Sequence, residues 1–270
     1  MNQFTIKREF GDLAYFTSGS GPYLLGLSGF GCTHYNFIDL VPHLAKNFTV
    51  VLIDNRGVGK SSATNADYKM SDLAADALAV MDHLNAKSFG VMGISMGGFI
   101  AQELVKLAPK RVSALSLLCS TSGPPTFHHE KTLAESDLRA FEAWDKLTQA
   151  EFMTKGTTHP TLMTKSPGTF QRIVNLRVEN AVDIEEKVRQ NRAAVEFLKT
   201  PFDLSVIQCP TYTLAGAEDR FLSPEFPAMF KTVIPQAVTE LIPETDHFFF
   251  LEKPDMVGPK LNNFFQGKII

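Results

Sequence analysis

Short apolar runs bounded by turn residues recur along the chain. Six runs, each short enough for a buried strand, span residues 23–27, 48–53, 89–92, 112–119, 211–215 and 238–242. Amphipathic stretches separate the first four, at residues 35–44, 70–84 and 98–107. This alternation of strand and helix predicts a mostly parallel sheet with helices on both faces. Residues 4–16 alternate apolar and polar positions, which predicts an antiparallel hairpin at the sheet edge.

The pattern changes in the third quarter of the chain. Charged sequence with helical periodicity covers residues 133–147 and 184–198, and no strong strand interrupts it. Gly-Pro-Pro and Lys-Thr-Pro tripeptides punctuate the two ends of this segment, as chain breakers do. We therefore expect a helical cap, residues 122–205, inserted into a core domain made of residues 1–121 and 206–270.

Composition narrows the class of protein. The chain has 270 residues, 44% of them hydrophobic, which is enough to bury a large core. Its net charge of −3 and its lack of lysine-rich runs argue against a nucleic-acid partner. The first ten residues lack the apolar core of a signal peptide, and no apolar stretch is long enough to cross a bilayer. We expect a cytoplasmic protein without membrane insertion.

The cysteines point in the same direction. Cys32, Cys119 and Cys209 are few, odd in number and without metal-ligand spacing. Such a set fits reduced thiols that serve as small apolar residues. Neither disulfides nor a metal site are expected.

One serine lies between a predicted strand and a predicted helix. The stretch Gly93-Ile94-Ser95-Met96-Gly97 follows the apolar run at residues 89–92 and opens an amphipathic segment. This arrangement is typical of a nucleophile elbow, in which small residues two before and two after the serine let strand and helix approach closely. A G-x-S-x-G pattern alone also fits an ordinary tight turn, so its context carries the argument.

A serine hydroxyl is a poor nucleophile unless an imidazole accepts its proton and a carboxylate orients that imidazole. After Ser95, Asp219 and His247 each follow a predicted strand, in the chain order Ser, Asp, His. Glu218 and Asp246 compete for the carboxylate role, but Asp246 adjoins His247, and neighbouring side chains in an extended segment point apart. The candidate triad is Ser95, Asp219 and His247, with a simple Asx-turn as the other interpretation of Asp219.

These motifs together give the chain a family resemblance. Over essentially its whole length it resembles α/β-hydrolases, on five motifs that occur in that family's order: S-G-F-G at 28–31, D-x-R-G-x-G-x-S at 54–61, the elbow at 93–97, L-A-G-x-x-D at 214–219 and D-H-F at 246–248. The resemblance implies an α/β-hydrolase fold and a serine esterase or lactonase chemistry without a cofactor. It also implies an oxyanion hole formed by the backbone N–H groups of Phe30 and Met96.

The composition of the expected pocket is apolar. Phenylalanine occurs 22 times, against 5 tyrosines and 1 tryptophan. Many of these rings belong to the core, and packing between cap helices accounts for others. His34 is a further candidate because it follows the Phe30 loop, although a structural role fits it as well. The candidate substrate-binding residues are His34, Phe99, Trp144, Phe221 and Phe248, with Phe127, Phe141, Met153, Leu162 and Met163 as further cap candidates.

Together these observations predict a serine hydrolase. We expect it to cleave a small to medium, apolar carboxylic ester or lactone through an acyl-enzyme intermediate. An enol-lactonase, or a hydrolase of carbon–carbon bonds in aromatic degradation, fits the same residues. A ligand-binding or signalling protein on a hydrolase scaffold is the alternative from another class. The expected partner is the small-molecule substrate, and the sequence leaves the oligomeric state open, a homodimer included.

Overall fold

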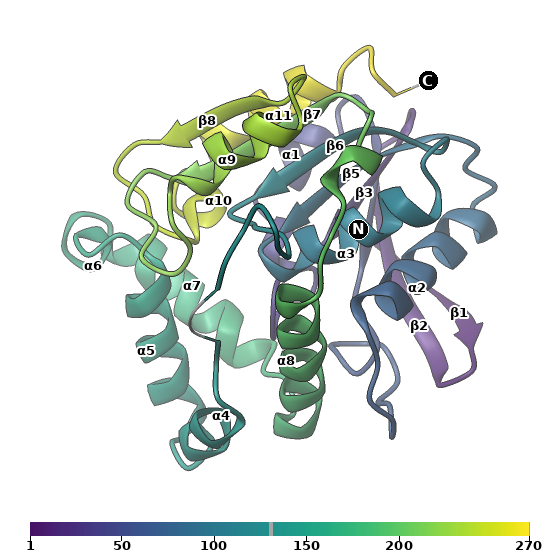
Figure 1. The fold of residues 1–270 in the computed structure, drawn as a ribbon. Coiled ribbons are helices and arrows are strands. Elements are labelled where there is room, and N and C mark those ends of the chain that lie inside the picture. The colour runs from purple at the N-terminus through teal and green to yellow at the C-terminus, as the bar shows by residue number, and fades with distance from the viewer. Residues whose placement is uncertain (130–131, 270) are drawn as a thin grey trace.

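The computed structural model describes residues 1–129 and 132–269, and its centre is one eight-stranded sheet (Figure 1). The strand order is β1-β2-β4-β3-β5-β6-β7-β8. The first two pairings, β1 with β2 and β2 with β4, are antiparallel, and all the others are parallel. The strands are β1 (Asn2–Arg8), β2 (Gly11–Ser18), β3 (Tyr23–Leu27), β4 (Thr49–Ile53), β5 (Phe89–Ile94), β6 (Val112–Leu118), β7 (Thr211–Gly216) and β8 (Val238–Ile242). The predicted strands, the edge hairpin and the mostly parallel sheet are confirmed.

Helices cover both faces of the sheet because successive side chains of each strand point to opposite sides. Leu25 and Leu27 of β3 join a buried cluster with α2 (Met70–His83), α3 (Met96–Leu107) and α9 (Phe226–Val233). Leu24, the residue before Leu25, joins a second cluster on the other face. The helical elements of that second face are η1 (His34–Phe37), α1 (Val41–Leu44), α10 (Phe249–Glu252) and α11 (Pro254–Phe265).

The single helix expected at residues 35–44 is two short ones, η1 and α1. Pro42 sits in the first turn of α1. Because proline has no N–H to donate to an earlier carbonyl, a continuous helix through this position would lose a hydrogen bond. The expectation of one helix was wrong at that residue.

Between β6 and β7 the described residues form five helices, and we call the segment that holds them the cap. They are α4 (Glu135–Phe141), α5 (Lys146–Thr157), α6 (Leu162–Lys165), α7 (Pro167–Glu179) and α8 (Ile184–Lys199), and the short η2 (Leu204–Val206) leads back to the sheet. Figure 1 shows α4 to α8 gathered below the sheet. The helix expected at 133–147 breaks before Asp145, whose side chain accepts hydrogen bonds from the N–H groups of Leu147 and Thr148 and so starts α5.

The cap is fastened to the core close to the end of β8. Arg220, in the loop after β7, donates from Nε to the buried carboxylate of Asp246 at 2.5 Å. The same guanidinium donates to the carbonyls of Lys155 and Thr158, at the end of α5, at 2.8 Å each. This link fixes the cap relative to the loop that carries His247. Within the described residues, no helix has the length and apolar character needed to cross a bilayer.

Candidate active site

Ser95 occupies the turn between β5 and α3 with a strained backbone. Its φ is 53° and its ψ is −118°, a region that serine rarely adopts. A Cβ atom on Gly93 would overlap the carbonyl of Gly97, and one on Gly97 would overlap the carbonyl of Leu27. The two glycines are therefore required by close backbone approach, as the sequence predicted.

His247 and Asp219 form a buried pair at the ends of β8 and β7. Nδ1 of His247 lies 2.8 Å from Oδ2 of Asp219. The other oxygen, Oδ1, accepts hydrogen bonds from the backbone N–H groups of Phe221 and Leu222 at 2.9 and 2.8 Å. The Asx-turn and the pairing with imidazole, considered as alternatives from the sequence, are thus both present, one on each carboxylate oxygen.

The two competing carboxylates are engaged elsewhere. Asp246 accepts from the Arg220 side chain and from the backbone N–H groups of Arg220 and His247. Glu218 lies near the surface, with its Oε2 2.8 Å from Nε2 of His159. Neither carboxylate contacts the His247 ring, so Asp219 is the group that orients it.

The surroundings of the imidazole control its protonation. Burial alone lowers the pKa of His247, but interactions with Cys119 and Asp219 outweigh it and raise that pKa well above its ordinary value. Burial also raises the pKa of the Cys119 thiol, so the thiol is neutral near pH 7. The contact with Cys119 and the carboxylate of Asp219 therefore both favour the imidazolium form.

Phe221 connects His247 to the space beside Ser95. The Phe221 ring packs against the imidazole with ring centroids 4.9 Å apart, and it lines the same cavity as Ser95. Among the described residues the Ser95 hydroxyl makes no hydrogen bond, including to His247. In enzymes of this kind such a bond often tightens only when substrate binds.

Two backbone N–H groups beside Ser95 lack an acceptor within the described part of the chain. They belong to Phe30 and to Met96, the residues that the family resemblance assigns to an oxyanion hole. The N–H of Met96 is one of the unpaired donors at the start of α3, where the helix dipole favours negative charge. Both donors are thus available to an external oxygen atom.

The loop that carries Phe30 is held on both sides of it. The N–H of Gly29 donates to Oδ1 of Asn36 at 3.0 Å, and that of Gly31 donates to Oε1 of Gln190 at 2.8 Å. The hydroxyl of Ser28 donates to a nearby carbonyl at 2.8 Å and fixes the start of the loop. The Phe30 N–H is therefore left free between two anchored neighbours.

An apolar cavity of about 270 Å³ opens at Ser95. Phe99 and Phe221, both predicted from the sequence, line it together with Phe30 and Met96. Residues that the sequence did not single out also line it: His129, Thr132, Leu133, Asn191, Ala194, Val195, Leu198 and Leu222. Four of these residues, at positions 191, 194, 195 and 198, lie on one face of α8. A helix that only packs against the core shows the same spacing, so the pattern does not distinguish the two roles.

His34, expected as a substrate contact, is placed differently. Its ring pairs with the carboxylate of Asp54 at 2.9 Å and stacks on Phe16 with centroids 3.7 Å apart. It does not line the Ser95 cavity. The buried Asp54 carboxylate also accepts hydrogen bonds from the backbone N–H groups of His34 and Lys60, so the His34 ring belongs to a structural cluster around Asp54.

Other aromatic candidates also lie outside the Ser95 cavity. Trp144 packs on neighbouring aromatic rings at the surface of the cap, where it is 43% exposed. Phe248 is buried, with the guanidinium of Arg177 4.2 Å from its ring centroid.

Phe127 is a fully buried core ring. Phe141 and Met153 line a second cavity described below. Leu162 and Met163 lie outside both cavities, the first buried and the second exposed.

Cys32, Cys119 and Cys209 are free thiols. Across the described residues, no group of three or more His, Cys, Asp and Glu side chains is arranged to hold a metal ion.

Comparisons with known proteins agree with this architecture. A family model described as the alpha/beta hydrolase fold matches residues 22–254. A Pseudomonas putida protein named the dihydrolipoyllysine-residue acetyltransferase component of an acetoin cleaving system is 26% identical, over 93% of this chain but only 66% of its own length. A thermophilic esterase from Thermogutta terrifontis superposes with a TM-score of 0.84 at 21% identity over the whole of both chains. An enol-lactonase from Burkholderia xenovorans superposes with a TM-score of 0.81 at 20% identity, covering 94% of this chain and 96% of its own. The chain belongs to the α/β-hydrolase fold family.

Proposed function

We propose that this protein is a serine hydrolase that cleaves small to medium, apolar carboxylic esters or lactones through an acyl-enzyme intermediate. The observation that carries the proposal is the pair of N–H groups, on Phe30 and Met96, that lie beside a strained serine and have no acceptor among the described residues. The ring of Phe221, which lines the Ser95 cavity, packs against an imidazole that is paired with a buried carboxylate. This combination suits acyl transfer, whose intermediate places negative charge on one oxygen.

The proposed reaction proceeds in two halves. His247 accepts the hydroxyl proton of Ser95 as the serine oxygen attacks the ester carbonyl, and the resulting oxyanion accepts hydrogen bonds from the N–H groups of Phe30 and Met96. Each such donor typically contributes about 3 kcal/mol to the transition state. The imidazolium then gives its proton to the departing alkoxide. Water, deprotonated by His247, attacks the acyl-serine and releases the acid.

The cavity supports the apolar substrate class. Its lining includes Phe99, Val195 and Leu198 and carries few polar side chains. Such a wall gains free energy by burying an acyl chain or an alkyl alcohol and offers no opposite charge to an ion. A lactone follows the same chemistry, except that its alcohol stays joined to the acyl group.

The test uses p-nitrophenyl butyrate. The wild-type protein should release p-nitrophenol, with a burst close to one equivalent if deacylation is slow, and Ser95→Ala should abolish the release. Glu218→Gln, which changes a carboxylate next to Asp219 in sequence, is the control and should keep the wild-type rate. A Ser95→Ala protein that turns over at the wild-type rate would rule out the proposed nucleophile. A ligand that raises Tm without turnover in the wild type would favour the binding-protein alternative.

A further inference from the structure

A second cavity, of about 100 Å³, shares Phe30 with the Ser95 cavity. Its walls come from the Phe30 loop and from α4, α5, α7 and the start of α8. Phe30 lines both cavities, so the two spaces meet at the residue whose N–H faces the reacting carbonyl in the proposed mechanism. A substrate bound at Ser95 could therefore extend past Phe30 into this second space.

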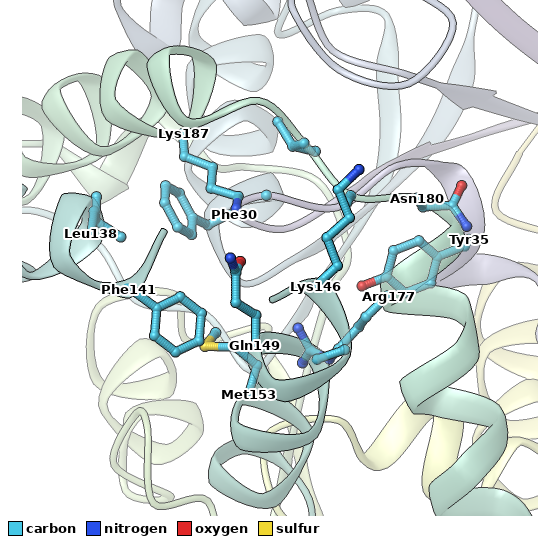
Figure 2. Close-up of a pocket in the computed structure, with 14 residues that line it drawn as sticks. Phe30, Tyr35, Leu138, Phe141, Lys146, Gln149, Met153, Arg177, Asn180 and Lys187 are labelled. Carbon is cyan, nitrogen blue, oxygen red and sulfur yellow. The ribbon is translucent and has the colours of Figure 1, made fainter. Parts of the chain in front are cut away.

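The second cavity is cationic. Lys146 from the first turn of α5, Arg177 from the last turn of α7 and Lys187 from α8 all line it, and no Asp or Glu among the described residues does. Figure 2 shows these three side chains around one space together with Phe30. Because three separate helices supply them, the clustering is a product of the cap's folding rather than of a charged run in the sequence.

These cations are poorly neutralised within the described chain. Lys146 has no ion-pair partner there, and Lys187, with its side chain only 18% exposed, has one carboxylate contact, 3.4 Å from Glu142. Nη2 of Arg177 donates to the hydroxyl of Thr157 at 2.8 Å, but its Nε is buried without any acceptor. Removing a guanidinium N–H from water without giving it an acceptor costs free energy. An ordinary lysine on a solvated face incurs no such cost.

We propose that this second cavity is a carboxylate-binding subsite, so that the preferred substrates are esters or lactones that carry a free carboxylate at a distance from the scissile bond. This inference rests on the proposed function and specifies its substrate class. Arg177, Lys146 and Lys187 would bind the carboxylate through charge-assisted hydrogen bonds. The apolar remainder of the substrate would occupy the Ser95 cavity, with the ester carbonyl at Phe30 and Met96.

A matched pair of substrates tests the subsite. Monomethyl adipate carries a carboxylate at the end remote from its ester, and methyl adipamate carries a neutral amide there. Wild-type kcat/KM should favour the acid over the amide. Lys146→Met and Lys187→Met should each lower that preference by on the order of tenfold, through a higher KM for the acid. Arg177→Lys keeps the charge but loses the planar pair of donors, and it should lower the preference as well.

The control is Lys155→Met. Lys155 lies on α5 like Lys146, but its side chain is 54% exposed near Glu151 and does not line the second cavity. It should keep the wild-type preference. If the wild type hydrolyses p-nitrophenyl butyrate but does not distinguish the acid from the amide, or if Lys155→Met reduces the preference as much as Lys146→Met, the subsite is wrong while the proposed function stands.

An equilibrium measurement separates the subsite from catalysis. In Ser95→Ala protein, adipate should raise Tm more than adipamide does, and this difference should disappear when Lys146→Met and Lys187→Met are added. The measurement needs no turnover, so it tests the subsite even if no ester is hydrolysed. Equal shifts from adipate and adipamide would overturn it. An equal shift from sulfate at the same ionic strength would show general attraction of anions and would overturn it too.

Discussion

Asp219→Asn tests the separate roles of the two carboxylate oxygens of Asp219 in the buried pair with His247. The wild-type carboxylate accepts a hydrogen bond from Nδ1 through Oδ2 and from two backbone N–H groups through Oδ1. An asparagine can keep its single carbonyl oxygen on the two backbone donors. Its amide group then faces Nδ1 as a donor and forces the proton of the neutral imidazole onto Nε2. In that tautomer His247 cannot accept the proton of Ser95.

The expected effect on rate is large and the effect on folding is small. A carboxylate-to-amide change that imposes the wrong tautomer in a serine triad lowers kcat by about 10⁴-fold, which corresponds to roughly 5.5 kcal/mol in activation free energy. Because the backbone hydrogen bonds of the loop are retained, we expect the free energy of unfolding to fall by only about 1 kcal/mol. A loss of kcat that far exceeds the loss in free energy of unfolding would show that the Asp219 carboxylate acts on the protonation of His247 rather than on folding.

The assay compares kcat for p-nitrophenyl butyrate with urea unfolding of the same preparations. Glu218→Gln makes the same chemical change one residue earlier, on a carboxylate that pairs with His159. It should leave kcat within about twofold, because surface pairs of this kind contribute little. A fall of less than tenfold for Asp219→Asn, or equal falls for both variants, would refute the reasoning.

Three further predictions follow from the same contacts. The pKa of His247 is raised above its ordinary value of 6.5, and the neutral base is lost as the pH falls through that raised pKa. The acid limb of kcat/KM should therefore have its midpoint above pH 6.5. A midpoint below pH 6.5 would contradict the assigned role of Asp219. Gly97→Val should destabilise the protein by about 3 kcal/mol or more in urea unfolding, because the valine side chain would overlap the Leu27 carbonyl. Unchanged stability would be inconsistent with this packing. Arg220→Gln removes the link from Asp246 to the end of α5. It should lower the free energy of unfolding by about 1–3 kcal/mol and speed proteolysis within the cap. Wild-type behaviour in both assays would show that this link does not hold the cap.

The sheet and the serine turn could be predicted from the sequence because local patterns encode them. Buried strands appear as short apolar runs, and the turn at Ser95 needs Gly93 and Gly97 whatever surrounds it. The pairing of Asp219 with His247 follows from topology, since parallel strands bring their carboxyl ends to one edge of the sheet.

The cap was harder to predict for a physical reason. Its sequence shows helical periodicity, and Asp145 and Pro167 mark where α5 and α7 begin, but the way these helices pack is set by tertiary contacts that a local pattern does not encode. Trp144 and Phe248 were expected to contact the substrate but do not line the Ser95 cavity, because packing between helices and lining a pocket require the same residue types. The clustering of Lys146, Arg177 and Lys187 depends on the same tertiary contacts.

The most direct test of the central claim is the crystal structure of the protein after reaction with an alkyl fluorophosphonate. The account predicts a covalent bond from phosphorus to Oγ of Ser95, with the phosphonyl oxygen about 2.7–3.1 Å from the backbone nitrogens of both Phe30 and Met96. An unmodified Ser95, or an adduct whose phosphonyl oxygen points away from those two nitrogens, would contradict it.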